Sequence, residues 1–342
     1  MNSVSPWKHP GFVQPLCGLL AAGLCLSAAD ARSPLHLDAI QRDGYGVVEL
    51  KQPIPNEFFA EGTINGHAVR LVLDTGFCSD HITMANTSAR LLRTPPQPIK
   101  GSAHGITGKA IDHLSKGTAD SLVLGNVQVS GTTLYFGSFQ FLNAPKDGGL
   151  YYSDGTVGIE RAERRDADGF LGLGFLQTCA AIIDLSNRRL YLKPPRTGRT
   201  AQLGPALKSV GFSEAPFELT GTGLLIDVEV NGIKGKMIID TGAYVSGVDS
   251  RFAAQAKLNR YRATNVRMVD AAGVQTEPDW ADPSNFKIGG VETFHPKLEV
   301  EPMSFYLPTG GKVIGLLGMD FIGQSWGIID FGQKKLYFSP TR

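Results

Sequence analysis

The stretch LVLDTG at residues 71–76 returns as MIIDTG at residues 237–242. In both copies an Asp-Thr-Gly triplet directly follows a run of apolar residues, which is the pattern of a buried strand that ends in a turn. One triplet alone is a weak signal, because Asp and Gly are ordinary turn residues. Two copies can deliver two carboxylates to one site across a pseudo-two-fold axis, provided that the surrounding sequence is duplicated as well.

The duplication extends well beyond the triplets. The segment GFLGLGFLQTCAAIIDLSNRRLYLKP from Gly169 aligns without a gap with GLLGMDFIGQSWGIIDFGQKKLYFSP from Gly315. Asn-Gly also precedes both triplets, at residues 65–66 and 231–232. The shared order of features indicates an internal repeat of roughly 135–155 residues, a normal domain size. The extra sequence at about 137–168 of the first copy is either a lid over one end of a cleft or a surface excursion.

Composition and length favour an all-β protein with two cores. The chain has 342 residues, of which 41 are Gly and 42% are hydrophobic, and such a length can bury two cores. Short apolar runs separated by Gly, Asn and Asp predict strands with few, short helices. We predict a first lobe at residues 32–195 and a second at 196–342, joined by the stretch 193–204. The formal net charge of +1 gives no electrostatic reason to expect a nucleic-acid partner.

The N-terminal segment has the pattern of a secretory signal. An apolar stretch from about Phe12 to Ala29 follows Lys8, and Ala-Asp-Ala at 29–31 fits a small-x-small cleavage site. We therefore interpret residues 1–31 as a signal peptide and expect a periplasmic or secreted protein without stable membrane insertion. An uncleaved N-terminal membrane anchor is the alternative, because the stretch is close to spanning length.

The remaining cysteines and the motif inventory limit the chemistry. Removal of the signal leaves Cys78 and Cys179. In an oxidising compartment they can form a disulfide, and two buried free thiols are the alternative. The sequence has no CxxC, HExxH or GxSxG motif, so it supports neither a metal site nor a serine nucleophile, and no cofactor is expected.

These features resemble the retropepsin-like aspartic proteases. Each half carries apolar-apolar-Asp-Thr-Gly and, further on, apolar-apolar-Gly before a short helix, and GLLGMDFI at residues 315–322 is most similar to bacterial members. The resemblance covers nearly all of the chain after the signal. It implies two retropepsin-like β-barrel lobes with short helices, related by a pseudo-two-fold axis, with an active-site cleft between them. Because both lobes lie in one chain, we expect a monomer that is an intramolecular pseudo-dimer.

The resemblance also implies roles for particular residues. Asp74 and Asp240 are the expected catalytic dyad. Their neighbours Thr75 and Thr241 are expected to brace the two loops through their hydroxyls. Glycines that let backbones approach closely complete the expected site: Gly76, Gly242, Gly172 and Gly318. Flaps over the cleft are expected at about residues 100–109 and 269–276.

The chemistry needs such a pair. Amide hydrolysis by water requires a base that takes the water proton and an acid that donates one. Two close carboxylates cannot both ionise easily, so they share a proton and supply both functions. We therefore predict an exported aspartic endopeptidase that binds an extended peptide or protein substrate across both lobes. A catalytically inactive protein that binds a peptide or partner with the same fold is the alternative.

The residues after the triplets distinguish this chain from pepsin-like enzymes. Those enzymes often carry Ser or Thr there, whose hydroxyl can donate to the carboxylate, whereas this chain has Phe77 and Ala243. Loss of a donor to the ionised form raises the pKa of a carboxyl, so we expect an activity optimum in the mildly acidic range. Phe77 is bulky where the second lobe has Ala, so it is expected either to crowd the site or to shape a side-chain pocket.

Overall fold

The computed structural model describes residues 37–77, 81–100, 103–105, 107–111, 113–139, 167–193, 200–262, 268–269, 274–306 and 308–341. The predicted signal peptide, Cys78, residues 194–199 of the predicted link and most of the 137–168 insertion lie outside them. Residues Ser33–Arg342 form one compact unit, and the lobe boundary at 195/196 stays a prediction. Within the described ranges, no helix has both the length and the apolar character needed to cross a membrane.

The described residues are mostly strands, with a few short helices, as the sequence predicts. Up to residue 193, which we call the first half, the elements are α1 (Leu37–Arg42), β1 (Gly46–Ile54), β2 (Glu57–Ile64), β3 (His67–Leu73), β4 (Ile82–Ala85), the 3-10 helix η1 (Asn86–Leu91), β5 (Gln97–Pro98), β6 (Ala103–His104), β7 (Ala110–Ile111), β8 (Ser115–Leu124), β9 (Val127–Gly137), β10 (Gly169–Leu171), α2 (Leu173–Thr178), β11 (Ile182–Asp184) and β12 (Arg189–Leu192).

From residue 200 onward, which we call the second half, the order of elements is similar. They are α3 (Gly204–Ser209), β13 (Ser213–Thr220), β14 (Gly223–Val230), β15 (Ile233–Ile239), β16 (Gly247–Asp249), α4 (Ser250–Gln255), β17 (Arg260–Arg262), β18 (Met268–Val269), β19 (Gln275–Thr276), β20 (Asp279–Ala281), β21 (Phe286–Ile288), β22 (Val291–Glu292), β23 (Leu298–Glu301), β24 (Val313–Leu317), α5 (Met319–Ile322), β25 (Ile328–Asp330) and β26 (Lys335–Phe338).

The two Asn-Gly pairs form the tight turns that lead into the triplets. Asn65-Gly66 joins β2 to β3, and Asn231-Gly232 joins β14 to β15. In both turns the Asn and the Gly have positive φ angles, 51° and 82° in the first and 49° and 81° in the second. This is the type I′ geometry, whose twist matches that of the flanking strands and which Asn-Gly adopts at low cost. The sequence therefore fixes the register of both strands that end in Asp-Thr-Gly.

The strands of the first half close a barrel. Pairings run from β2 to β3, β10, β4, β9 and β8 and then back to β2. In the second half the same path runs from β14 through β15, β24, β16 and β23 to β20, while β21 pairs with β14. The gap between β20 and β21 contains Pro283, which has no N–H for a ladder and disfavours an unbroken strand.

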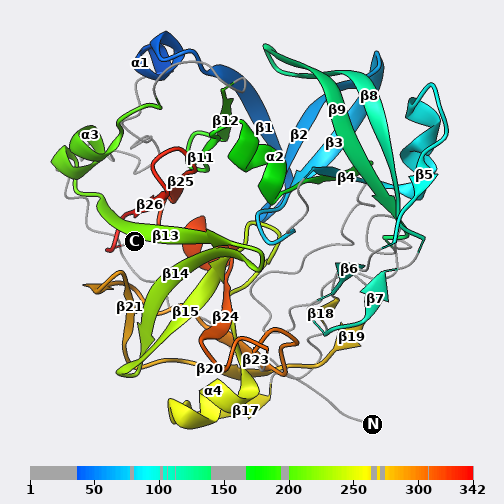
Figure 1. Cartoon of the computed structure of the whole chain (residues 1–342). Coiled ribbons are helices and arrows are strands. Elements are labelled where there is room, and N and C mark those ends of the chain that lie inside the picture. The colour runs from blue at the N-terminus through cyan, green and yellow to red at the C-terminus, as the bar shows by residue number, and fades with distance from the viewer. Residues whose placement is uncertain are drawn as a thin grey trace, which may run out of the picture. The chain divides into compact units, whose positions relative to one another are not determined.

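A further sheet joins the two halves. Its strands follow the order β1, β12, β11, β25, β26 and β13, and all neighbours are antiparallel. The halves meet at β11 and β25, where Ile183 lies opposite Ile329 (Figure 1). Both strands come from the Ile-Ile-Asp segments that match in the sequence, so equivalent segments of the two halves pair with each other.

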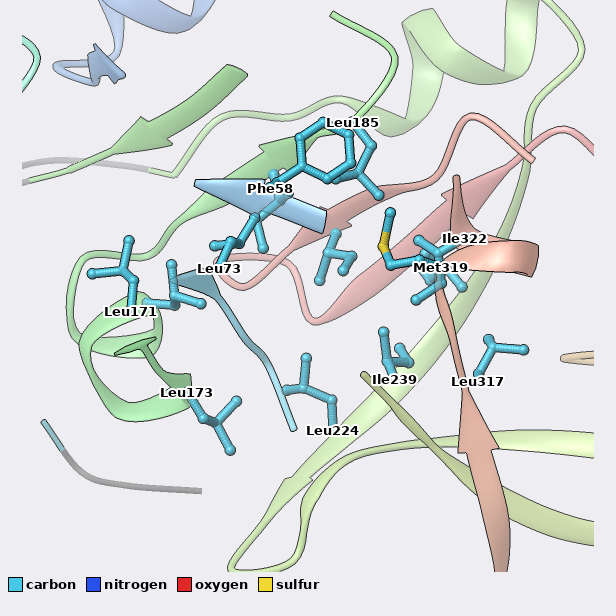
Figure 2. Packing of buried hydrophobic residues seen from close by; sticks show 14 of the residues in the cluster. Phe58, Leu73, Leu171, Leu173, Leu185, Leu224, Ile239, Leu317, Met319 and Ile322 are labelled. Carbon is cyan, nitrogen blue, oxygen red and sulfur yellow. The ribbon is translucent and has the colours of Figure 1, made fainter. Parts of the chain in front are cut away.

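One apolar cluster runs through both halves and reaches the triplets. Leu73 and Ile239, each directly before a triplet Asp, are fully buried in it together with Leu171 and Leu317 of the neighbouring parallel strands (Figure 2). Burial of such side chains stabilises a fold by about 1.5–3 kcal/mol each. The strand ends that carry the carboxyls are therefore set by the shared core.

We expect the contact between the halves to contribute strongly to stability. Ile183→Ala and Ile329→Ala each remove a fully buried side chain at the joining strands, so each should lower the free energy of unfolding by about 2–5 kcal/mol. Denaturant unfolding measures this change. Val210→Ala, at a residue that is 52% exposed, serves as the control and should shift the value by no more than about 0.5 kcal/mol. Core variants that match this control would contradict the role of the joining strands.

Candidate active site

Both triplets lie at equivalent points of the fold. Each follows the last residue of a strand that pairs in parallel with a second strand, β3 with β10 and β15 with β24. The backbone N–H of Asp74 donates to the carbonyl of Leu171 at 3.3 Å, and that of Asp240 donates to the carbonyl of Leu317 at 3.0 Å. The backbone of each Asp is thus fixed by the neighbouring strand of its own half.

The two threonines cross-link the triplet loops. The Thr75 hydroxyl donates to the carbonyl of Ile239 at 2.8 Å and accepts from the N–H of Thr241 at 3.0 Å. Reciprocally, the Thr241 hydroxyl donates to the carbonyl of Leu73 at 2.9 Å and accepts from the N–H of Thr75 at 3.0 Å. Both threonines are buried, so these four bonds are shielded from water and lock one loop against the other.

The triplet glycines bring each loop against the carboxyl of the other. A Cβ atom on Gly76 would overlap the carboxyl of Asp240, and one on Gly242 would overlap the carboxyl of Asp74. Only glycine leaves room for this approach. The two carboxyls are close enough that each influences the pKa of the other. The structure therefore brings together Asp74 and Asp240, as one site built by both halves requires.

Gly172 and Gly318 lie behind the loops. A Cβ on Gly172 would lie 2.9 Å from the carbonyl oxygen of Phe77, and one on Gly318 would overlap the backbone of Val245. The residues that follow these glycines also hold the loops: the N–H of Leu173 donates to Phe77 O at 3.0 Å, and the N–H of Met319 donates to Ala243 O at 2.9 Å. The helices α2 and α5 thus begin directly against the backbone that carries the carboxyls.

The environment raises the pKa of both carboxyls, by unequal amounts. Burial is the largest cause for each, and the charge of Asp240 further raises the pKa of Asp74, which lies well above its ordinary value. Backbone N–H groups oppose this: Phe77 donates to Asp74 at 2.9 Å, whereas Gly242 and Ala243 donate to Asp240 at 2.8 and 3.1 Å. Because donors stabilise the ionised form, these N–H groups favour the carboxylate form of Asp240 over that of Asp74.

Phe77 packs into an aromatic cluster. Its ring stacks on Phe170 with a centroid distance of 5.0 Å and an interplanar angle of 6°, and it meets the edge of Phe139 at 5.5 Å. Phe139 and Phe170 are buried, so the partly buried Phe77 ring is held by apolar neighbours close to Asp74 in the chain. The sequence repeat did not reveal this arrangement, because Phe139 has no matched position in it.

Short hairpins occupy the two predicted flap regions. The first is β6 paired with β7, which extends two residues beyond the predicted range, and the second is β18 paired with β19. A Cβ on Gly108, in the first hairpin loop, would lie 3.3 Å from Cβ of Ser304 in the second half. The first hairpin therefore reaches the other half of the molecule. Their action as flaps stays a prediction.

Other acidic and sulfur groups have structural partners or are inert. Asp184 accepts hydrogen bonds from Ser186 and Asn187 within its own turn, as expected for a hairpin residue. Cys179 is a buried free thiol whose pKa is raised to about 12 by burial. In the part of the chain that the structure describes, no group of three or more His, Cys, Asp or Glu side chains could hold a metal ion.

Asp320 is a site residue that the sequence did not reveal. Its carboxylate accepts hydrogen bonds from the N–H and hydroxyl of Ser246, at 2.8 and 2.7 Å. The same hydroxyl accepts from the N–H of Gly318 at 3.0 Å. Asp320 therefore positions the loop beyond the second triplet. Burial raises its pKa to about 6.

Comparison with known proteins relates part of the chain to one protein family. The family model of the gag-polyprotein putative aspartyl protease matches residues 226–324, which confirms the predicted resemblance to retropepsin-like aspartic proteases for the segment with the second triplet. No curated protein matches the chain. The family match and the all-β fold support a protease-type function.

Two solved structures resemble the chain at low identity. Aspartic proteinase from Irpex lacteus is 13% identical, with 87% of this chain and 98% of that chain covered and a TM-score of 0.46. Basic 7S globulin from soybean is 10% identical, with 87% of this chain and 95% of that chain covered and a TM-score of 0.41.

Removal of the Thr75 hydroxyl tests the link between the loops. Thr75→Val leaves the carbonyl of Ile239 and the N–H of Thr241 without their partner in a buried place, so it should lower the free energy of unfolding by about 1–3 kcal/mol per lost bond. Thr75→Ser keeps the hydroxyl and should retain most of the stability. Equal stability of the two variants in thermal and denaturant unfolding would show that the hydroxyl does not hold the loops.

The raised pKa values predict the pH range of hydrolysis. A carboxyl pair that hydrolyses amides is active when singly protonated, so its activity lies between the two pKa values of the pair. Burial raises the pKa of both carboxyls here, and the charge of Asp240 raises that of Asp74 further. We therefore expect kcat/KM to peak in the mildly acidic range, to fall at higher pH as the pair loses its proton, and to fall at lower pH as both carboxyls protonate.

Ala243→Ser tests the cause of that shift. A hydroxyl beside Asp240 adds a donor to its ionised form and should move the lower limb of the profile, where Asp240 protonates, to lower pH. A wild-type optimum at strongly acidic pH, or a lower limb that the added hydroxyl leaves in place, would count against this explanation.

Proposed function

We propose that this chain is an exported aspartic endopeptidase whose catalytic dyad is Asp74 and Asp240. The observation that carries the proposal is the juxtaposition of the two carboxyls by reciprocal threonine hydrogen bonds. Two carboxyls held in contact have a shared proton, which is the state that amide hydrolysis by a carboxyl pair requires.

In the proposed mechanism the two carboxyls have different starting roles. Asp240 carries more backbone donors and begins as the carboxylate that takes a proton from the attacking water. Asp74 holds the proton and donates it to the oxygen of the scissile carbonyl, which becomes a tetrahedral intermediate. Asp240 then transfers the proton that it took to the leaving nitrogen, and the C–N bond breaks. As the carbonyl of the new carboxylic acid forms, a hydroxyl of the intermediate returns its proton to Asp74, so the pair again holds one proton. The reaction consumes one water molecule and needs no other reactant.

The surroundings of the dyad support a peptide as substrate. Phe77, which is partly buried and held by Phe139 and Phe170, follows the Asp74 triplet and suits an apolar side chain beside the scissile bond. The backbone of the β6–β7 and β18–β19 hairpins can pair with an extended peptide in a strand-like manner. Export through residues 1–31, to the periplasm or the medium, is part of the same proposal.

Asp240→Asn tests the dyad. An amide cannot act as the base, so cleavage of a peptide library, measured by mass spectrometry, should fall by at least about 10²-fold, the lower end of the contribution of acid–base catalysis. Asp227→Asn removes an exposed carboxylate of the same half that pairs with Lys236, and this control should cleave like the wild type.

Folding and inhibitor binding separate the two classes of function. Asp240→Asn should retain the cooperative thermal transition of the wild type, which shows that the fold is intact. Full cleavage by a folded, purified Asp240→Asn protein would refute the dyad. A wild type that binds library peptides but cleaves none, with or without a statine-type inhibitor, would instead support the non-catalytic binding protein.

A further inference from the structure

Two buried polar side chains face each other across strands of the second half. Strands β20 and β23 are neighbours in the sheet (Figure 1). In their antiparallel pairing Trp280 lies opposite Glu299. Their strand neighbours Ala281, Leu298 and Val300 belong to the main apolar core. Because side chains alternate along a strand, Trp280 and Glu299 lie on the face of the sheet that is turned away from that core.

Both side chains have a polar atom without a partner. Trp280 is 3% exposed and Glu299 is 7% exposed. The indole N–H of Trp280 and Oε1 of Glu299 make no hydrogen bond with any described residue. Buried polar groups are nearly always hydrogen-bonded in native proteins, and exceptions require an explanation. Here two exceptions lie on directly opposed residues, which points to a ligand that both groups recognise.

The pair lies between the second triplet loop and the second hairpin. Trp280 packs on Val245, and Tyr244 and Met268 pack against the same cluster. Tyr244 and Val245 follow the Asp240 triplet closely in the chain, and Met268 belongs to β18. Gly247 of β16, the strand that follows this loop, pairs directly with Glu299 of β23. The pair is therefore close in the fold to the loop that carries Asp240.

The charges around Glu299 favour a cation. Burial raises its pKa most, and the carboxylates of Glu301 and Asp320 raise it further. Glu57 of the first half adds negative charge near the loop, where it raises the pKa of Tyr244 after burial does. The neighbouring Asn56 donates to the carbonyl of Tyr244 at 3.2 Å, so this part of the first half is held against the loop.

We propose that Glu299 determines substrate specificity by accepting a hydrogen bond from a Lys or Arg side chain of the peptide, in a subsite walled by Trp280 and Val245. The apolar stem of such a side chain packs on the indole ring and on Val245, while its charged end reaches the carboxylate. The indole N–H of Trp280 donates to a carbonyl oxygen of the same peptide. This inference rests on the proposed endopeptidase function, which it extends to a class of substrate.

Paired peptides measure the subsite directly. Each pair differs only by Lys or Met at one position, and the position is moved along the residues that flank the scissile bond. The wild type should prefer Lys at one position by about 10-fold or more in kcat/KM, the effect of one charge-assisted hydrogen bond. Glu299→Gln should abolish this preference and leave the cleavage of the Met peptides within about 3-fold of wild type, a difference that is small on the same scale.

Controls keep the result specific. Glu301→Gln removes a neighbouring carboxylate of the same strand and should retain the Lys preference. Glu299→Met is a second variant in case the amide is not tolerated, and thermal melting verifies the fold of each. No Lys preference in the wild type, a preference that persists in both Glu299 variants, or a stronger preference for Gln than for Lys would overturn the cationic subsite.

Binding to an inactive chain separates this inference from the proposed function. In the Asp240→Asn background, the Kd of the Lys peptide should be lower than that of the Met peptide, and Glu299→Gln should equalise them. Lys-selective binding that depends on Glu299, together with a wild type that cleaves nothing, would reject the endopeptidase and keep the subsite. Cleavage without any Lys preference would reject the subsite and keep the endopeptidase.

Discussion

The reciprocal hydrogen bonds of Thr75 and Thr241 are the interaction on which the site depends. Each hydroxyl donates to a backbone carbonyl of the other half and accepts from the N–H of the other threonine. Threonine suits this place because its hydroxyl can do both at once. Without this link, two carboxyls that repel each other when ionised would tend to separate. The shared apolar core and the pairing of β11 with β25 also hold the two halves, and therefore the loops, together.

The two carboxyls that this link holds together differ in their electrostatic environments. The halves are similar in topology, yet the residues after their triplets differ, so the carboxyls do not have equal environments. Asp240 receives more N–H donors, while Asp74 lies beside the aromatic cluster of Phe77. The packing around the two loops differs as well. An aromatic cluster packs around Phe77 after the first triplet, whereas Trp280, opposite Glu299, packs on Val245 after the second. A substrate that crosses both halves would thus meet different surfaces on its two sides.

Local sequence signals predicted much of the fold and of the site. Asn-Gly turns, apolar strands and triplet glycines act through neighbours in the chain or through the repeat, so the sequence was sufficient to propose Asp74 and Asp240 together. Features that depend on long-range register were not accessible: the pairing of Trp280 with Glu299, the stack of Phe77 on Phe170, and the bond of Ser246 to Asp320. The gap between β20 and β21 was not predicted. It contains Pro283, which has no counterpart in the first half, so the repeat gave no sign of it.

If the two triplets build one site, Asp74 and Asp240 must titrate as one pair. Carbon-13 NMR of the aspartate carboxyls during a pH titration of the wild-type protein observes this behaviour. We expect the two carboxyl resonances to respond to both of two protonation steps, one of them well above the ordinary range of aspartate. We expect Asp74→Asn to leave Asp240 with a single, lower step. Two carboxyls that titrate independently, each in one step near the ordinary value, would contradict the single site.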